Sequence, residues 1–255
     1  MSDLFNRLAE SLKNQRPVAL ATVIRGKEIG SKILIWPDGK TSGSLDSADL
    51  KEQVLQRVQD LFKKQKSQRI RIPPEEETEI FIEVFPPSPK LIIVGAVHVA
   101  IHLISFAKEL GFRAIVVDPR SAFATPERFA HADELIVEWP NQVLSASNFN
   151  ESTYLVVLSH DEKLDNPALK LALESPCRYI GALGSRKTHG KRMASLKEMG
   201  ITDEQLSRIY APIGLDLGGR RPQEIAIAVM AQIVAVRNGL KAEEDKSRSN
   251  PHISH

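Results

Sequence analysis

Short apolar runs, separated by stretches long enough to form helices, dominate the chain beyond position 90. Five of these runs are KLIIVG, RAIVVD, ELIVE, TYLVVLS and CRYIGALG, which begin at Lys90, Arg113, Glu134, Thr153 and Cys177. Continuous apolar runs of this length are typical of strands that are buried on both faces of a parallel sheet. Because such strands alternate with helices, and because their crossovers are right-handed, the pattern predicts a Rossmann-like, doubly wound parallel sheet of the α/β class.

The chain before position 86 has a different pattern. Strands are predicted over 17–24, 32–36 and 79–85, where β-branched and aromatic residues are concentrated. One amphipathic helix is predicted over 46–64, where apolar residues recur at helical spacing. This combination predicts a small α+β domain at the N-terminal end.

A proline-rich segment separates the two predicted domains, and a charged segment follows the second one. Residues 86–90 contain three prolines, which remove backbone donors and fix the backbone, so this segment is predicted to be a linker. The predicted domains therefore cover 1–85 and 91–240, and the last helix is predicted over 222–238 with proline at its first position. Residues 241–255 are charged and are predicted to form a disordered tail.

The composition argues against several classes of function. The net charge is only +2, so the overall charge favours neither nucleic acid nor a membrane surface as a partner. No stretch approaches the roughly 18 apolar residues of a membrane span, and residues 1–13 lack the pattern of an export signal, so a cytoplasmic protein is expected. The one cysteine, Cys177, is interpreted as a core residue. No metal site is predicted.

Ligands of open parallel sheets bind beyond the carboxyl ends of the strands, so the loops that follow the strands are the candidate ligand-binding segments. The loop GAVHVA begins at Gly95 and resembles a dinucleotide fingerprint, but Val97 occupies the place of the second glycine. A side chain there obstructs the approach of a pyrophosphate to the backbone. The loop therefore indicates a Rossmann-like fold more strongly than it indicates NAD binding, with His98 at its mouth.

Two further loops carry polar residues after predicted strands. Asp118 lies about 20 residues beyond Gly95, where an acid would bond a ribose hydroxyl, and Arg120 could meet a phosphate. An aspartate turn with an exposed arginine is an equally supported interpretation. His160 follows the TYLVVLS strand and is expected to face the same crevice, where it could donate to a ligand or move a proton. The alternative is a polar cap on the next helix.

The segment YIGALGSRK runs from a strand into a helix and carries positive charge at the helix start. Gly181 and Gly184 permit a tight turn, and Ser185 can cap the helix. Exposed amides together with Arg186 and Lys187 would then form an anion site. An anion would offset the unfavourable placement of cations at a helix N-terminus. A solvated basic helix face is the alternative interpretation.

The last loop, APIGLDLGGRRPQEIA, brings Gly214 and two arginines to the start of the final helix, where a second phosphate or carboxylate could dock. No convincing pair of nucleophile and base is found, so no catalytic residue is predicted. A non-catalytic cofactor carrier and an NAD(P)-dependent oxidoreductase remain open at this point. A protein that binds only a regulatory nucleotide is a third possibility.

In their order and separation, GAVHVA, VVDPR, SHD, YIGALGSRK and PIGLDLGGRRPQEIA resemble the xanthine dehydrogenase accessory protein family, the XdhC/CoxI proteins. The resemblance covers residues 90–239. It implies a chaperone that binds the molybdenum cofactor (molybdopterin), assists its sulfuration by a cysteine desulfurase and delivers it to a xanthine dehydrogenase-type molybdoenzyme. It also implies a homodimer.

The resemblance also implies where the cofactor lies. Its phosphate is expected at Gly184 to Lys187, its pterin against Gly95 to His98, and one side is closed by Asp118 to Arg120. The residues expected to bind the cofactor are Gly95, Ala96, His98, Asp118, Arg120, His160, Gly181, Gly184, Ser185, Arg186, Lys187 and Gly214.

Overall fold

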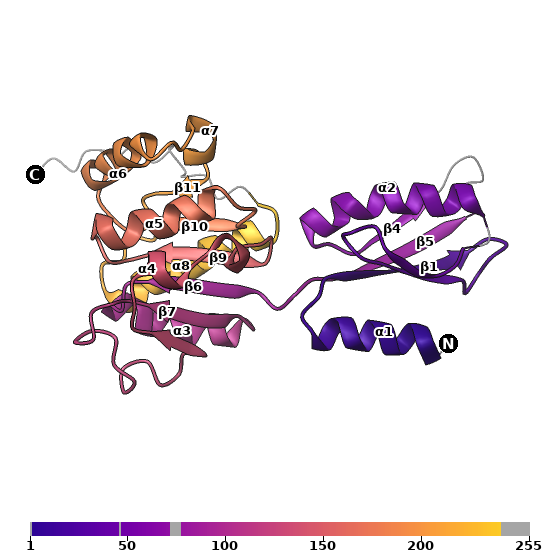
Figure 1. Ribbon diagram of the computed structural model, residues 1–255, viewed down its shortest axis with the longest axis horizontal. Coiled ribbons are helices and arrows are strands. Elements are labelled where there is room, and N and C mark those ends of the chain that lie inside the picture. The colour runs from indigo at the N-terminus through magenta and orange to yellow at the C-terminus, as the bar shows by residue number, and fades with distance from the viewer. Residues whose placement is uncertain (1, 46, 72–77, 241–255) are drawn as a thin grey trace, which may run out of the picture. The chain divides into compact units, whose positions relative to one another are not determined.

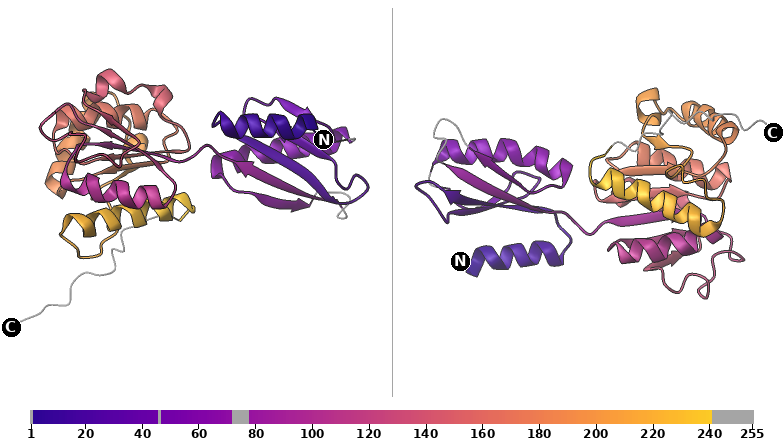
Figure 2. Two further views of the ribbon diagram at one scale, coloured as in Figure 1. Left: turned by 90° about the horizontal axis from the view of Figure 1, so that it is seen from below. Right: turned by 180° about the vertical axis from the view of Figure 1, so that it is seen from behind.

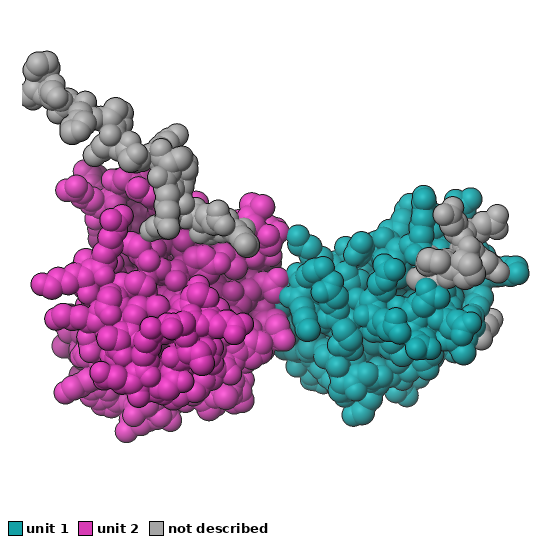
Figure 3. Space-filling model, turned by 90° about the horizontal axis from the view of Figure 1, so that it is seen from above, with its two compact units in different colours: residues 1–88 teal, residues 89–255 magenta. Residues whose placement is uncertain are grey.

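The computed structural model of the 255-residue chain describes residues 2–45, 47–71 and 78–240. The chain forms two compact units, residues 1–88 and 89–255, which Figure 3 colours separately. The division falls inside the proline-rich segment that was predicted to be a linker. The predicted tail over 241–255 lies outside the described residues.

Unit 2, residues 89–255, is built on a six-stranded sheet whose neighbouring strands all pair in parallel. Across the sheet the strand order is β11-β10-β9-β6-β7-β8 (Figure 1). Strands are first added on one side of β6 and then, from β9 on, on its other side, so the strand order reverses between β6 and β9. This is the order of the Rossmann fold, and the predicted doubly wound sheet is confirmed. The strands are β6 (Lys90–Val94), β7 (Arg113–Val117), β8 (Glu134–Ile136), β9 (Thr153–Val157), β10 (Tyr179–Ala182) and β11 (Ile209–Tyr210).

Helices cover both faces of this sheet. On one face α3 (His98–Glu109) and α8 (Pro222–Arg237) lie side by side (Figure 2) and share a core with alternate residues of the strands. On the other face α5 (Glu162–Leu173) and α6 (Arg186–Glu198) pack through residues such as Leu169 and Leu196. The short helices are α4 (Pro140–Val143), the 3-10 turn η1 (Ala146–Asn148) and α7 (Asp203–Leu206).

Cys177 lies just before β10 and is buried, as predicted. Its thiol donates to the carbonyl of Thr153 at 3.3 Å. Burial raises the pKa of this thiol to about 12. A thiolate is therefore strongly disfavoured at this position, and Cys177 serves as a small core residue.

Unit 1, residues 1–88, contains a five-stranded antiparallel sheet in the order β3-β2-β1-β5-β4. The helix α2 (Ala48–Lys64) packs on one face through Val54 and Val58, and it is capped by Ser47. The helix α1 (Ser2–Lys13) packs on the other face. The small α+β fold is therefore confirmed. The strands are β1 (Val18–Arg25), β2 (Lys32–Ile35), β3 (Thr41–Gly43), β4 (Gln68–Arg71) and β5 (Glu79–Phe85).

Three elements of unit 1 were not predicted, namely α1, β3 and β4. The apolar residues of α1 that face the sheet, Leu4 and Leu8, cover a small cluster around Trp36, while Phe5 remains 69% exposed. In β4 only Ile70 is buried. The weak apolar patterns of β3 and β4 acquire a regular structure only by pairing with the strands next to them, β2 and β5. The helix α1 is amphipathic, with Leu4 and Leu8 at helical spacing, so its own pattern could have predicted it. None of the described helices is long and apolar enough to cross a bilayer.

Candidate functional site

The loops that follow β6 and β9 meet at the switch point, where the strand order of the sheet reverses. A Cβ atom placed on Gly95 would lie 2.8 Å from the backbone nitrogen of Ser159. The φ of Gly95 is +110°, a conformation that also favours glycine. The first glycine of GAVHVA thus allows the two loops to touch, in the crevice where doubly wound folds bind ligands.

Asp118 holds the loop after β6 in place. Its fully buried carboxylate accepts the amide of Ala96 at 2.7 Å and two bonds from the Arg120 guanidinium at 2.9 and 2.7 Å. Burial opposes ionisation, but the bonds from Arg120 and the backbone outweigh it and lower the pKa of Asp118. Because both carboxylate oxygens are bonded to protein donors, a ribose hydroxyl would have to compete with Arg120, whose side chain is 33% exposed.

The remaining residues of the first loop differ in their access to a ligand. Ala96 is fully buried, and its amide is committed to Asp118. Val97 is half-buried and precedes α3 without a side-chain cap. His98 is exposed in the first turn of α3. Within the described residues, no three His, Cys, Asp or Glu side chains are grouped so that they could hold a metal ion.

His160 occupies an unusual backbone conformation at the end of β9. Its φ is +61°, which is uncommon for a residue other than glycine, and its side chain is exposed. The cap of α5 is Asp161, whose carboxylate accepts the amide of Lys163 at 2.9 Å. The interpretation of His160 itself as a helix cap is therefore wrong, and its side chain remains available to a ligand.

The second basic loop forms the predicted helix start. Ser185 is the N-cap of α6, and its hydroxyl accepts the amide of Thr188 at 3.2 Å. Arg186 and Lys187 are exposed, and the first turn of α6 contains no acid. Gly184 has a φ of +150° and is half-buried in the turn. The positive charge at this helix start therefore lacks a compensating acid in its own first turn.

Two glycines of the expected set have packing roles. Gly181 lies inside β10, where a Cβ would come within 2.5 Å of Ile213 Cδ1. Gly214, with a φ of +90°, lies against the backbone of α8. Gln232 holds Gly214 in place, since its Oε1 accepts the Gly214 amide at 2.9 Å and the Tyr179 hydroxyl at 2.6 Å. Gly181 thus allows Ile213 to pack against β10, and Gly214 allows its turn to pack against α8.

A buried ion pair beneath the crevice was not predicted from the sequence. Arg192, on the second turn of α6, is 2% exposed, and its Nη2 donates to Asp165 at 3.0 Å and to the carbonyl of Leu183 at 3.2 Å. Asp165 is fully buried and also accepts the hydroxyl of Ser159 at 2.6 Å. Burial raises the pKa of Asp165. This network ties the loop after β9 to the loop after β10.

A signal for this pair was present in the sequence. Arg192 lies four residues before Leu196, so both face the core side of α6, and Asp165 lies four residues before Leu169 on α5. Opposite charges at core positions of two successive helices indicate a buried pair, because neither charge can be buried alone at small cost.

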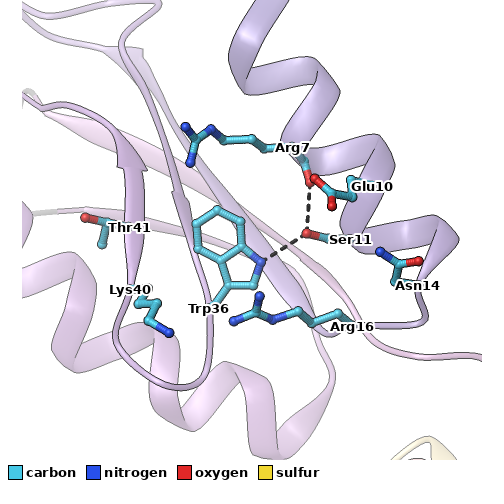
Figure 4. Close-up of a pocket in the computed structure, with 8 residues that line it drawn as sticks. All are labelled: Arg7, Glu10, Ser11, Asn14, Arg16, Trp36, Lys40 and Thr41. Atoms are coloured by element: carbon cyan, nitrogen blue, oxygen red, sulfur yellow. Dashed lines mark hydrogen bonds between the residues drawn. The ribbon is translucent and has the colours of Figure 1, made fainter.

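Unit 1 has a pocket of about 340 Å³ between α1 and the turn from β2 to β3 (Figure 4). Trp36 forms its wall and donates its indole N–H to Ser11 at 3.0 Å. The cations around it already have carboxylate partners: Arg7 pairs with Asp3, and Arg16 and Lys40 share Asp38. An anion in this pocket would therefore compete with carboxylates of the protein, unlike an anion at α6.

The fold and this geometry define a class of protein: a Rossmann-type domain with polar and basic residues in the loops near its switch point, joined to a small antiparallel α+β unit. The model of the XdhC Rossmann domain matches residues 91–233, and the model of the XdhC and CoxI family matches residues 11–73. The chain therefore belongs to the XdhC and CoxI family.

Three curated relatives align with part of the chain. A protein of Bacillus subtilis (strain 168), named as a probable xanthine dehydrogenase subunit, is 35% identical over 163 residues, or 64% of this chain and 47% of that protein. The uncharacterized protein YqeB of Escherichia coli (strain K12) is 31% identical over 62% of this chain and 29% of its own. The molybdenum cofactor insertion chaperone PaoD of the same organism is 35% identical over 40% of this chain and 31% of its own. The chain thus spans about half or less of these relatives.

One solved structure matches both units. The crystal structure of a xanthine dehydrogenase from Bacillus halodurans has a TM-score of 0.70 to this chain and is 24% identical in sequence. The match covers 98% of this chain and 71% of that chain. At this identity the likeness supports the fold alone.

Proposed function

We propose that this protein binds the molybdenum cofactor and assists its insertion into a xanthine dehydrogenase-type molybdoenzyme. Its family and its similarity to PaoD, a molybdenum cofactor insertion chaperone, support this proposal. The observation that carries it is the basic start of α6, which has no acid in its first turn and lies next to the switch-point crevice. A protein that carries an anionic cofactor needs exposed cations to bind it. It does not need a nucleophile and a base.

The residues around the crevice fit a ring system that bears a phosphate. Ser185, Arg186 and Lys187 would hold the phosphate, because helix amides and cations converge there. The exposed side chains of His98 and His160 would border the ring system. When bound, the cofactor would supply the molybdenum chemistry to the client enzyme, while the protein binds, orients and shields it.

The proposal includes sulfuration of the bound cofactor by a cysteine desulfurase. Cys177 is the one cysteine of the chain, and it is buried with its pKa raised to about 12. It is therefore unsuited to carry a persulfide. Because the one cysteine of the chain is unsuited to this role, the proposal requires the desulfurase to form a complex with this protein. We also propose a homodimer, which sedimentation equilibrium would test.

An oxidoreductase that uses NAD(P), or a protein that binds a regulatory nucleotide, is the second candidate. The glycine turn at Gly95 and the acid at Asp118 favour it. Two observations weigh against it. Val97 places a side chain where a pyrophosphate would approach the backbone, and both oxygens of Asp118 are bonded to protein donors.

An anaerobic titration separates the two candidates. The purified protein would be titrated with molybdenum cofactor and, in parallel, with NADH and NADPH, and binding followed by absorbance and tryptophan fluorescence. We expect saturable binding of the molybdenum cofactor in the micromolar range or tighter, and none of the nicotinamides. Binding of a nicotinamide alone would contradict the carrier function and support the second candidate.

A further inference from the structure

The most unusual polar group in unit 2 is the guanidinium of Arg192. Among the described residues, its Nε and Nη1 have neither a hydrogen-bond partner nor access to solvent. These atoms carry three of the five N–H donors of an arginine. Asp165 compensates the charge of Arg192, but it leaves these donors unused. Buried donors without partners are rare in folded proteins, and each one requires an explanation.

The guanidinium with the unused donors lies against the turn that precedes α6. Helical side chains tilt towards the helix N-terminus, so Arg192 reaches from the second turn back to the turn that contains Leu183 and Gly184. A Cβ placed on Gly184 would lie 3.6 Å from Nη1 of Arg192. Cβ and Cγ2 of Thr188 would lie at 3.3 Å from the same Cβ, so the backbone of Gly184 and the side chain of Thr188 lie next to Nη1.

We propose that Arg192 is the inner ligand of a site for a phosphate or diphosphate group at the turn over 183–185. The anion accepts hydrogen bonds from Nη1 of Arg192 after a small movement of the turn at Gly184 and of the Thr188 side chain. Ser185, Arg186 and the first amides of α6 bind its outer oxygens. This inference deepens the proposed function, because it assigns the cofactor's phosphate to particular donors.

The arrangement of donors favours phosphate over a carboxylate. The inner donors belong to one planar guanidinium, and the outer donors belong to a separate group, the start of α6. A carboxylate has two oxygens in a single plane, whereas a phosphate presents oxygens in several directions. The charges agree as well, since Arg192 and Asp165 neutralise each other and the exposed Arg186 and Lys187 are left to balance the anion.

His189 precedes Arg192 by three residues on α6. Its Nδ1 is also buried without a partner among the described residues. Burial and the charge of Arg192 lower the pKa of His189, so the ring is neutral at neutral pH. Two side chains of one helix thus have unused buried nitrogen atoms.

Inorganic pyrophosphate is the probe for this site, and the full-length protein is the sample. Binding would be measured by calorimetry, and the Nε–H resonance of Arg192 followed by ¹⁵N NMR. We expect pyrophosphate to shift this resonance saturably, and Arg192→Lys, which retains the charge but lacks the Nε and Nη donors, to weaken binding at least tenfold.

The matched control is Arg208→Lys in the same unit. The Arg208 guanidinium donates to the carbonyls of Leu173 and Cys177 at 2.7 Å, so this variant should bind pyrophosphate within twofold of the wild type. If Arg192→Lys does not fold, the double variant Asp165→Asn/Arg192→Gln removes both buried charges together and is expected to show the same loss.

Two results would overturn the inference: equal pyrophosphate affinity in the wild type and in the Arg192 variants, or no shift of the Arg192 resonance at saturating pyrophosphate. The latter would show that Arg192 only braces the carbonyl of Leu183. The proposed function is tested separately by the cofactor titration. Cofactor binding without a role for Arg192 would refute this inference alone, and pyrophosphate binding at Arg192 without cofactor binding would refute the proposed function alone.

Discussion

Two helix starts in unit 2 resemble each other in sequence and differ in structure. Both α6 and α8 follow glycine-containing turns, and both begin next to two adjacent cations. At α8, the carboxylate of Glu224 accepts the amides of Arg220 and Arg221, each at 2.9 Å. At α6, the first turn contains no acid.

The difference lies in one position of the first turn. Glu224 is the third residue of α8, and Thr188 is the third residue of α6. A carboxylate at the third position satisfies amides at the start of its own helix and compensates the helix dipole. The start of α8 is therefore satisfied within the protein, whereas the start of α6 is suited to an external anion. At the second docking site suggested by the sequence, this carboxylate already accepts two of the backbone amides that an anion would use.

The largest effect is expected beneath α6. Asp165→Ala leaves the guanidinium of Arg192 buried without its counter-ion and should lower the free energy of unfolding by about 3–5 kcal/mol. Urea denaturation followed by circular dichroism measures this loss. The control is Glu134→Ala, which removes an exposed ion pair with Arg113 and should cost less than about 1 kcal/mol. Similar losses in both variants would show that Asp165 is not an essential counter-ion.

Charge reversal tests whether the two helix starts differ in ligand binding. Arg186→Glu should weaken binding of molybdenum cofactor by about 1.5–3 kcal/mol, because it removes a charged hydrogen bond at the start of α6. The matched variant Arg220→Glu at the start of α8 should leave the affinity unchanged. Equilibrium titration of both variants measures the contrast. Equal effects would contradict the assignment of the anion site to α6.

Exchange of the deciding residue should convert one helix start into the other. Thr188→Glu supplies α6 with the acid that α8 has, and it should stabilise the protein by about 0.3–1 kcal/mol in thermal denaturation. The same variant should lower the affinity for pyrophosphate, because the new carboxylate competes for the helix amides. Thr188→Gln keeps the size without the charge and is the control. Undiminished affinity in the glutamate variant would remove the helix amides from the site.

The smallest effect is expected at α8 and depends on pH. The amides of Arg221 and Arg220 lower the pKa of Glu224 below its ordinary value of 4.5 in the folded protein. Glu224 therefore stabilises the fold above pH 4.5, and this contribution is lost as the pH falls through the lower folded value. Glu224→Gln should slightly lower the melting temperature at pH 7. The two proteins should converge as the pH falls below the lowered pKa of Glu224, and a difference that persists there would exclude the carboxylate charge as its source.

Much of unit 2 could be predicted from local pattern. Buried parallel strands are continuous apolar runs, so β6, β7 and β9 were recognisable without knowledge of their partners. The two-residue strand β11 has no pattern of its own and was missed. In unit 1, β3 and β4 escaped for the same reason, because they are short and have few buried residues. The amphipathic helix α1 was missed although its pattern is local.

The candidate site was only partly predictable. Gly95 and Ser185 have local backbone requirements, a positive φ and a helix cap, which residue type alone suggests. Asp118 was placed correctly at a strand end, but its bond to Ala96 depends on a loop 22 residues away. Whether an acid faces a ligand or a neighbouring loop is decided by packing.

The sequence by itself determined the class of fold, the succession of buried strands along the chain and the helix start at Ser185, because these depend on hydrophobic period and local capping. Only the tertiary structure decided which charges are paired inside the protein. Arg192 and Asp165 are 27 residues apart, and they meet because α5 and α6 pack on the same face of the sheet. That packing buries one guanidinium while it leaves Arg186 in solvent, although both belong to the same basic segment.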